Sequence, residues 1–297
     1  DLDVFYKSFP ENFFITITGT NGKSTTCKLL HDILSKQKYD VRLVGNIGNP
    51  ILSEKKIKPK TIFVVEASSY QLEYSKIFKS KYAAILNISP DHIERHKTFR
   101  NYINAKLKLF KNQLKNSLAF IKQDDFFLKR ELYQKKLNCK LIKVKTDNFN
   151  KTQIELKNKY FMTETNKENL SFVVSIAEKL RLNKNLMLKT ILKFKGLKYR
   201  QQIIYKKPNF LIINDSKSTS FSSSMGILKA YPNIFWLLGG VYKKGDKFDL
   251  PKKYHHKIRA FIFGKKRNFF KAQLKGKIKY ENFETLEKAF KKILSIS

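Results

Sequence analysis

Two glycines, a lysine and several hydroxyl-bearing residues lie close together in the stretch TITGTNGKSTT, which covers residues 16–26 and follows an apolar run. A strand that leads through a glycine turn into a helix presents backbone N–H groups at the helix N-terminus, where phosphate groups bind. Lys23 would reach the terminal phosphates of a nucleotide, and the Ser24 hydroxyl would ligate magnesium. Ile17 stands where the general phosphate-binding loop has its first glycine, so a structural glycine turn is the alternative to nucleotide binding.

Polar side chains follow three further apolar runs. Glu66 ends the run IFVVE, His92 comes shortly after YAAILNIS, and Asp215 ends NFLIIND, with Lys217 and Thr219 just beyond. Because ligands bind in the crevice at the carboxyl ends of parallel strands, these positions are candidate site residues. The structural alternatives are a solvated carboxylate, a polar loop histidine and a surface lysine, and the pattern alone leaves them open.

Apolar runs alternate with amphipathic stretches through the first part of the chain. Enrichment in β-branched and aromatic residues predicts four buried strands, and helical periodicity predicts helices between them. We expect strands at 13–17, 61–68, 82–89 and 117–121, and helices at 24–37 and 98–110. Strands that alternate with helices imply a parallel sheet covered on both faces.

A second series of elements follows a turn-like joint, GLKYRQQ, near Gly196. Helical patterns at 168–180 and 186–194 lead into this joint. Beyond it, we expect strands at 209–215, 234–240 and 260–264, and helices at 222–230 and 282–294. We therefore predict two α/β domains, residues 1–198 and residues 199–297.

The charge balance is strongly basic, with 61 Lys and Arg against 24 Asp and Glu and a formal net charge of +37. Only eight of these cations are arginines, and the lysines are scattered, whereas specific nucleic-acid readers favour arginine forks and clustered stripes. We therefore expect no nucleic-acid partner, although attraction of small anionic substrates remains plausible. No apolar run approaches the roughly 20 residues of a membrane span, so we expect no membrane partner.

The two cysteines, Cys27 and Cys139, share no motif and form no disulfide framework. This usage fits a reducing compartment, so we expect a cytoplasmic protein. For Cys27, which lies on the predicted helix after the glycine turn, a small buried hydrophobic side chain is the favoured interpretation over a reactive thiol.

Five motifs, taken together and in order, resemble those of the Mur ligase family, the ATP-dependent enzymes that add amino acids to the peptidoglycan precursor. They are GTNGKST at 19–25, VGNIGNP at 44–50, VEASSYQLE at 65–73, NISPDHIERH at 87–96 and NDSKSTS at 214–220. The resemblance implies a P-loop-type parallel-sheet central ATPase domain followed by a partial Rossmann-like C-terminal domain. VEASSYQLE and NDSKSTS are similar to the members that add D-glutamate. Another amide ligase of the superfamily, such as another Mur ligase or a folylpolyglutamate synthase, and a non-catalytic relative are the alternatives.

The family's chemistry indicates what these residues would do. ATP phosphorylates the carboxylate of UDP-N-acetylmuramoyl-L-alanine, and D-glutamate attacks the acyl phosphate, so the resemblance implies these three small-molecule substrates. It also implies two Mg²⁺ ions. Ser24 and Glu66 would hold one ion, while His92 and a carbamylated Lys106 would hold the other. Together with Lys23, His92 and Lys106 are the predicted catalytic residues, and Lys108 is a competitor for the carbamylated position.

The resemblance extends to the nucleotide and the incoming amino acid. Predicted ATP contacts are Gly19, Thr20, Asn21, Gly22, Lys23, Ser24, Thr25, Asn46, Asn166, Asn169, Arg200 and Asp215. Predicted substrate contacts are Lys217, Thr219 and Lys243, with Lys244 as an alternative to the last. Turn chemistry for Asn46, helix capping for Asn166 and Asn169, and a surface linker position for Arg200 are the structural alternatives.

Both ends of the chain depart from the family pattern. The sequence begins at Asp1 without an initiator methionine and stops at Ser297 directly after a predicted helix. We expect a fragment that lacks the family's uridine-nucleotide domain and the end of its C-terminal domain, and that is inactive by itself. The family suggests a monomer.

Overall fold

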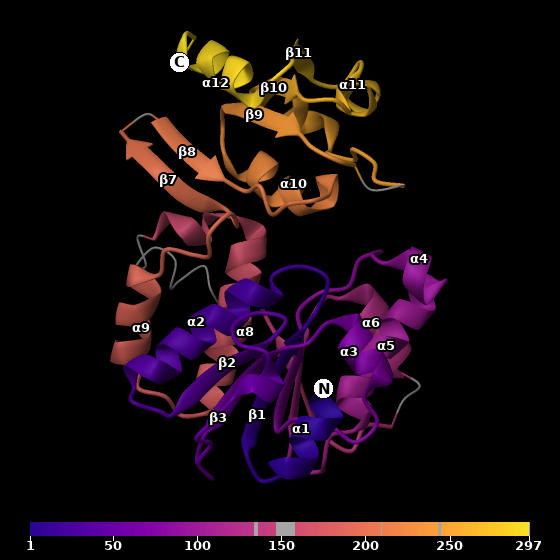
Figure 1. The fold of residues 1–297 in the computed structure, drawn as a ribbon, viewed down its shortest axis with the longest axis vertical. Coiled ribbons are helices and arrows are strands. Elements are labelled where there is room, and N and C mark those ends of the chain that lie inside the picture. Colours follow the sequence, from indigo (N-terminus) through magenta and orange to yellow (C-terminus); the bar gives the residue numbers. More distant parts are fainter. Residues whose placement is uncertain (134–135, 147–157, 209, 243–244, 297) are drawn as a thin grey trace. The chain divides into compact units, whose positions relative to one another are not determined.

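The computed structural model describes residues 1–133, 136–146, 158–208, 210–242 and 245–296 (Figure 1). The chain divides into two compact units, Asp1–Leu197 and Lys198–Ser297. The sequence places the boundary between 198 and 199, and the structural division falls between 197 and 198. Each unit has its own hydrophobic core, and each is described separately below.

The first unit is built on a six-stranded parallel sheet with the order β2-β3-β1-β4-β5-β6. Its strands are β1 (Phe13–Thr18), β2 (Val41–Gly45), β3 (Ile62–Glu66), β4 (Tyr82–Ile85), β5 (Leu118–Lys122) and β6 (Lys140–Val144). In the register, Ile17 lies opposite both Glu66 and Ala84, so the strands on either side of β1 end at the same edge of the sheet as β1. This edge carries the glycine loop.

Helices cover both faces of this sheet, as a parallel sheet requires. On one face lie α2 (Lys23–Lys36), α8 (Glu164–Lys179) and α9 (Lys184–Lys193), whose apolar side chains share a core with one side of the strands. On the other face lie α1 (Leu2–Ser8), α3 (Ser69–Tyr74), α5 (Phe99–Lys111) and α6 (Phe126–Tyr133) (Figure 1). Short helical segments at Ile51–Ser53, Ile93–His96 (α4) and Lys159–Met162 join these elements.

The second unit contains a three-stranded parallel sheet with the order β11-β10-β9. Its elements are β9 (Ile234–Gly239), β10 (Ile258–Phe263), β11 (Lys279–Phe283), α10 (Phe221–Ala230), α11 (Arg267–Leu274), α12 (Leu286–Leu294) and a 3-10 helix at Lys252–Lys257. Phe221 and Leu228 of α10 pack with Ile262 on one face, while Ala289 of α12 packs with Phe261 on the other. The predicted α/β fold, with two parallel sheets, is confirmed.

The strand predicted at 209–215 does not belong to this parallel sheet. It is β8 (Phe210–Asn214), which pairs antiparallel with β7 (Gln202–Lys207), a strand that was not predicted and that begins at the last residue of the expected joint GLKYRQQ. Antiparallel neighbours need only a short connection, whereas parallel strands need a long crossover, so strands this close in sequence pair as a hairpin. The expectation that Asp215 follows a strand of the parallel sheet is therefore wrong.

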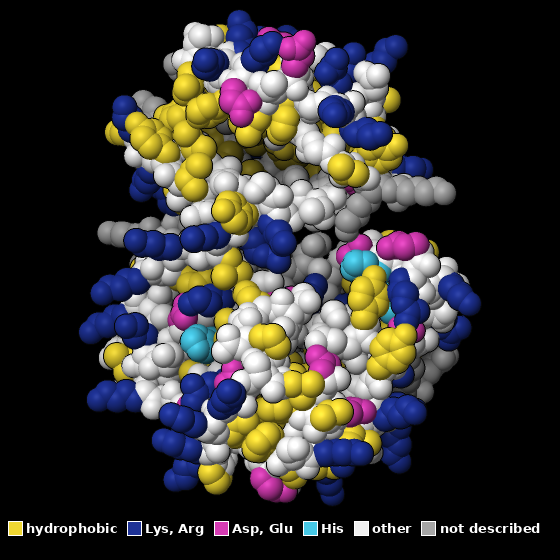
Figure 2. Space-filling model, in the orientation of Figure 1, with side chains coloured by type: hydrophobic (Ala, Val, Ile, Leu, Met, Phe, Trp, Pro, Cys, Tyr) yellow, Lys and Arg dark blue, Asp and Glu magenta, His cyan; other side chains and the backbone are white. Residues whose placement is uncertain are grey.

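Lysine and arginine side chains are spread over the surface of each unit on the face that Figure 2 shows. This distribution is expected, because few lysines can be buried without a partner. Among the described residues, no helix is long and apolar enough to cross a membrane.

Candidate nucleotide and metal site

The turn between β1 and α2 depends on its two glycines. Gly19 has φ of 148° and Gly22 has φ of 87°, both in the region that L side chains rarely adopt. A Cβ atom at Gly22 would lie 2.0 Å from Oδ1 of Asn169, and one at Gly19 would lie 3.2 Å from Cβ of Leu86. Gly22 precedes the first residue of α2, so the backbone N–H groups of the first helical turn open toward this loop.

The loop is tied to the segment that follows β4. The backbone N–H of Thr20 donates to the carbonyl of Asn87 at 2.9 Å. The Thr20 hydroxyl donates to the Ser89 carbonyl at 3.1 Å, accepts from the Ser89 N–H at 3.0 Å, and lies 3.0 Å from the Tyr102 hydroxyl. These hydrogen bonds fix the position of the loop relative to the edge of the sheet.

The side chains of the first helical turn have different surroundings. Nζ of Lys23 donates to the carbonyls of Gly19 and Thr20 at 3.0 and 2.9 Å, so the ammonium lies at the loop itself. Ser24 is buried. The Thr25 hydroxyl lies 3.4 Å from the Tyr160 hydroxyl, so its side chain points into the unit and its expected nucleotide contact would come from the backbone.

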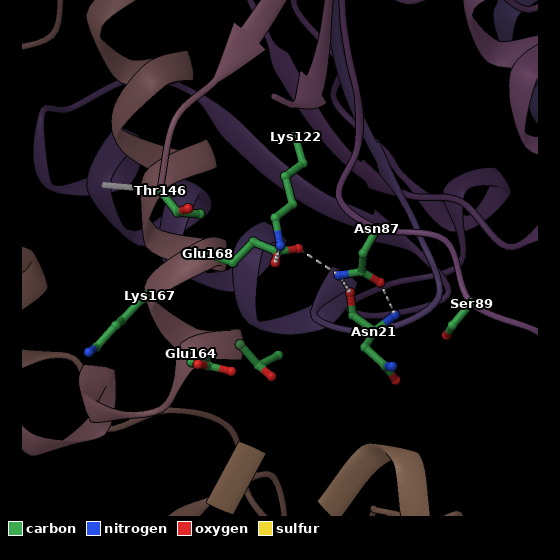
Figure 3. A pocket seen from close by; sticks show the side chains of 9 residues that line it. Asn21, Asn87, Ser89, Lys122, Thr146, Glu164, Lys167 and Glu168 are labelled. Atoms are coloured by element: carbon green, nitrogen blue, oxygen red, sulfur yellow. Dashed lines mark hydrogen bonds and ion pairs between the residues drawn. The ribbon is translucent and has the colours of Figure 1, made fainter. Parts of the chain in front are cut away.

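A polar cavity of about 560 Å³ opens beside the loop (Figure 3). Its lining residues come from the loop, from the segments after β4, β5 and β6, and from the start of α8; they are Asn21, Asn87, Ser89, Lys122, Thr146, Glu164, Thr165, Lys167 and Glu168. Apart from Asn21, none of these residues was predicted as a site residue. Asn87 and Ser89 lie in the motif NISPDHIERH, so the argument from strand ends could have found them.

Glu66 ends β3 and is 1% exposed. Its Oε1 accepts a hydrogen bond from Nδ2 of Asn46 at 3.0 Å, and the Asn46 N–H donates to the Glu66 carbonyl at 3.0 Å. Oε2 is buried and has no hydrogen-bond partner among the described residues. An unpartnered buried carboxylate oxygen is costly unless a cation compensates it, so this position fits a magnesium ligand.

Lys106 on α5 is buried against the start of the same loop. Its Nζ donates to the Gly19 carbonyl at 2.9 Å and to the Thr18 hydroxyl at 3.2 Å, and lies 4.7 Å from the centre of the Tyr102 ring. Burial and the nearby charge of Lys23 hold the pKa of Lys106 well below its ordinary value, and Asp91 and Glu66 oppose that shift. A neutral amine is the form that attacks CO₂, so the site fits the carbamylation expected from the sequence.

Lys108 lies differently from Lys106. Its ammonium donates to the carbonyl of Glu73 at the end of α3, away from the glycine loop. The geometry therefore favours Lys106 as the position for carbamylation.

His92 lies at the N-terminal end of α4 with φ of 52°, and its ring is partly exposed. Nδ1 lies 2.9 Å from the Tyr70 hydroxyl, and Nε2 lies 3.5 Å from a carboxylate oxygen of Asp91. His96 is buried instead, with Nε2 3.0 Å from the Ser69 hydroxyl, and burial lowers the pKa of its ring. His96 therefore has a structural role in the interior, and Tyr70 is a partner of His92.

Within the described ranges, no three His, Cys, Asp or Glu side chains form a metal cage. Mg²⁺ commonly takes one or two carboxylates and completes its shell with phosphate oxygens and water. The unpartnered Oε2 of Glu66 fits such an open site, and Ser24 is the partner expected from the sequence. The second expected ion would rely on His92 and a carbamate on Lys106, which supplies the anionic oxygen that the lysine itself lacks.

The predicted adenine contacts on α8 have unequal surroundings. Nδ2 of Asn166 donates to the Tyr160 carbonyl at 2.8 Å, and the Asn166 backbone N–H donates to the Thr163 hydroxyl at 3.3 Å. Oδ1 of Asn169 is buried without a partner among the described residues, directly beside Gly22. The geometry gives Asn166 a structural role and leaves Asn169 closer to the loop.

The candidate residues of the second unit surround its first hairpin. The Asp215 carboxylate accepts from the Gln201 N–H at 2.9 Å and from the Ser218 hydroxyl at 2.6 Å. Burial raises the pKa of Asp215, and these hydrogen bonds and the charge of Arg200 oppose that shift. Lys217 and Thr219 are exposed. The predictions for Lys243 and Lys244 lie outside the described residues.

Cys27 is buried, and its pKa is raised well above the ordinary value by burial and by the charge of Glu66. A thiol in this state is a poor nucleophile, which agrees with the structural interpretation.

The sequence matches the Mur ligase middle domain family over residues 17–187, so the chain belongs to the Mur ligase family. It is 34% identical to the UDP-N-acetylmuramoylalanine–D-glutamate ligase of Rickettsia felis, over 98% of this chain and 68% of the relative. It is 31% identical to the enzyme of the same name from Clostridioides difficile, over 84% of this chain and 59% of the relative. The predicted resemblance is confirmed. Mur ligases are ATP-dependent ligases that use ATP and Mg²⁺.

Solved structures share the fold. The MurF ligase of Thermotoga maritima in complex with ADP superposes with a TM-score of 0.71 at 17% identity, over all of this chain and 76% of that one. MurF from Acinetobacter baumannii gives a TM-score of 0.71 at 19% identity, over 99% of this chain and 72% of that one.

Proposed function

We propose that this chain belongs to an enzyme that couples ATP cleavage to the addition of D-glutamate to UDP-N-acetylmuramoyl-L-alanine, releasing ADP and phosphate. The observation that carries the proposal is the unpartnered Oε2 of buried Glu66 at the sheet edge that also holds the glycine loop and Lys106. The names of the relatives and the motifs VEASSYQLE and NDSKSTS support D-glutamate as the acceptor.

In the first half of this reaction, the substrate carboxylate attacks the γ-phosphoryl group and forms an acyl phosphate, with ADP as leaving group. The loop N–H groups and the Lys23 ammonium offset the charge on the phosphate oxygens, once Lys23 exchanges its bonds to Gly19 and Thr20 for phosphate. Bound Mg²⁺ supplies further positive charge there. Ser24 and Glu66 would hold one ion, and Asn46 orients Glu66 through Oε1.

In the second half, the amine of D-glutamate attacks the acyl carbon, and phosphate leaves from the tetrahedral intermediate. Lys106 would already be carbamylated before this step: its neutral amine attacks CO₂ and gives up a proton to water, and the resulting carbamate carries the negative charge that the amine lacks. His92 and this carbamate would hold the second ion. Lys217, Thr219 and Lys243 would bind the D-glutamate carboxylates, and Arg200 and Asp215 would contact the nucleotide.

The nucleoside of ATP has space in the cavity beside Asn21, since the cavity is polar and adjoins the loop that would hold the phosphates. Asn169 lies on the same helix as the cavity residues Glu164 and Glu168, which supports its assignment to the nucleotide.

The test is phosphate release with ATP, Mg²⁺ and UDP-N-acetylmuramoyl-L-alanine, with D-glutamate compared against L-glutamate, L-lysine and diaminopimelate. Since this chain spans 68% of the Rickettsia felis relative, the assay uses both these 297 residues and the product of the gene read to its natural ends. Release that requires D-glutamate supports the proposal. Release with another acceptor would support a ligase and contradict D-glutamate as its substrate. Lys23→Ala is the inactive control.

A further inference from the structure

A chain of polar side chains connects the far wall of the cavity to the glycine loop (Figure 3). Lys122, at the end of β5, donates to Oε2 of Glu168 at 2.8 Å. Oε1 of Glu168, on α8, accepts from Nδ2 of Asn87 at 3.0 Å. Asn87, in the segment after β4, then contacts Asn21 of the loop. Side chains from three separate parts of the chain are therefore linked in series to one loop residue, Asn21.

The carboxamide of Asn87 makes two hydrogen bonds with the backbone of Asn21. Oδ1 accepts from the Asn21 N–H at 2.9 Å, and Nδ2 donates to the Asn21 carbonyl at 3.2 Å. An amide side chain can accept and donate at once, whereas a carboxylate or an ammonium cannot. The Asn87 backbone carbonyl accepts a hydrogen bond at 2.9 Å from the N–H of Thr20, the residue before Asn21. Asn87 thus fixes the orientation of two successive loop residues.

Glu168 holds the Asn87 amide in the orientation that this pairing needs. Its carboxylate is largely buried and accepts from Asn87 and from Lys122 through different oxygens. Burial alone would lower the pKa of Lys122, but the hydrogen bond and the charge of Glu168 outweigh it and raise that pKa. Both carboxylate oxygens of Glu168 accept hydrogen bonds, one from each partner, and this arrangement requires the NH₂ end of Asn87 to face Glu168.

We propose that Asn87 is a positioning residue for nucleotide binding, which presents the loop N–H groups to phosphate, and that the Lys122–Glu168 pair holds Asn87 in place. This inference rests on the proposed function of the loop. Hydrogen-bond donors that are fixed before the ligand arrives need no reorganisation on binding, so a loop released from Asn87 binds phosphate less tightly.

The experiment measures the dissociation constant of Mg·ADP by titration calorimetry, for the 297-residue chain and its variants. Asn87→Asp keeps the shape but cannot donate to Glu168, and Glu168→Gln keeps the shape but removes the charge that holds Lys122. We expect each to weaken binding by about tenfold, because each loses a hydrogen bond to a charged group or gains a repulsive contact. Lys122→Arg should bind Mg·ADP with the wild-type affinity, and Lys122→Met should bind it less tightly.

Lys179→Met is the matched control. Lys179 lies on the same helix as Glu168, at an exposed position near its C-terminal end, and does not line the cavity. This variant removes one positive charge without changing a contact of Asn87, Glu168 or Lys122. We expect its affinity to stay within about twofold of the wild type, since removal of a solvated charge has a small effect.

Hydrogen exchange distinguishes positioning from general destabilisation. Asn87→Ala should speed exchange of the Asn21 amide, while the Thr26 amide, which donates to Gly22, keeps its protection. Wild-type affinity in Asn87→Asp and Glu168→Gln would overturn the proposal and leave the proposed function standing, as would weaker binding with unchanged exchange at Asn21. If the wild-type chain does not bind Mg·ADP, the nucleotide loop itself is refuted and this inference falls with it.

Discussion

At the scale of single residues, the Glu66 carboxylate carries the strongest physical argument. One oxygen is satisfied by Asn46 and the other is buried without a partner among the described residues. We predict that Glu66→Gln weakens Mg·ADP binding by about tenfold or more, as loss of a charged ligand should. ADP binding in the presence of a chelator should hardly change. Glu178→Gln, at an exposed position near the end of α8, is the control.

Lys106 allows a second prediction at the same scale. Lys106→Ala should abolish ligase activity of the longer gene product, because no carbamate can form, and short carboxylic acids should restore part of it. Lys108→Ala should remain active, since Lys108 contacts α3 instead of the loop. Phosphate release measures both. Full activity of Lys106→Ala would remove this residue from the site.

At the scale of elements, the sequence predicts the interior of the large sheet better than its edges. β1, β3 and β4 are buried and read as continuous apolar runs, so they were predicted. β2 and β6 form the two edges, are only partly buried, and carry Arg42 and Lys143 within short runs. Neither gives an uninterrupted apolar signal, so both were missed, as was the edge strand β11.

The candidate site shows the same limit. The loop from Gly19 to Ser24 is local in sequence, and its residue types and spacing favour a phosphate-binding turn. Asn87 and Glu168 are 81 residues apart, and Lys122 and Glu168 are 46 apart, so their contacts arise only from the order of the strands and the position of α8. Helix patterns could not predict these pairs.

The packing of α2 against α8 gives a prediction for Gly22. Gly22→Ala should lower the free energy of unfolding by about 1–3 kcal/mol, from backbone strain and from the clash with Asn169. When Asn169→Ala is added to Gly22→Ala, the free energy of unfolding should recover the part that the clash removes. The part lost to backbone strain should remain lost. Urea unfolding measures each variant. Equal stability of the single and double variants would mean that the contact with Asn169 does not constrain the loop.

Helix α1 is held by a carboxylate whose protonation should be visible in acid. Asp3 accepts from the Ser75 hydroxyl and from the backbone N–H groups of Lys76 and Phe78. Burial would raise the pKa of Asp3, but these hydrogen bonds together lower it. The folded state therefore binds this proton less tightly than the unfolded state does, and the stabilisation is present above the unfolded pKa of about 3.9.

This stabilisation should be lost as the pH falls from about 4 through the lower folded pKa. Asp3→Asn should be less stable than the wild type at neutral pH and should lose less stability on acidification. Urea unfolding at a series of pH values measures both slopes, with the exposed Glu11→Gln as control. Parallel curves for Asp3→Asn and wild type would contradict the role of these hydrogen bonds.

At the scale of the whole molecule, the two units contribute different parts of the proposed chemistry. The first holds the loop, Glu66 and Lys106 at one sheet edge, with His92 in the segment beyond β4, and the second holds Asp215 beside the β7–β8 hairpin. Net charge of +37 spread over many lysines favours the approach of anionic substrates without selecting among them. Specificity therefore has to come from the residues of the site.

Isotope transfer distinguishes the proposed ligase reaction from simple hydrolysis of ATP. UDP-N-acetylmuramoyl-L-alanine labelled with ¹⁸O in its carboxylate is incubated with ATP, Mg²⁺, D-glutamate and the longer gene product, and the released phosphate is analysed by mass spectrometry. An acyl phosphate places a carboxylate oxygen between carbon and phosphorus, and amide formation leaves that oxygen on phosphate. We predict one ¹⁸O in each phosphate released, with the ligated product containing D-glutamate. Unlabelled phosphate would mean that ATP is cleaved by water, and would contradict the proposed ligase reaction.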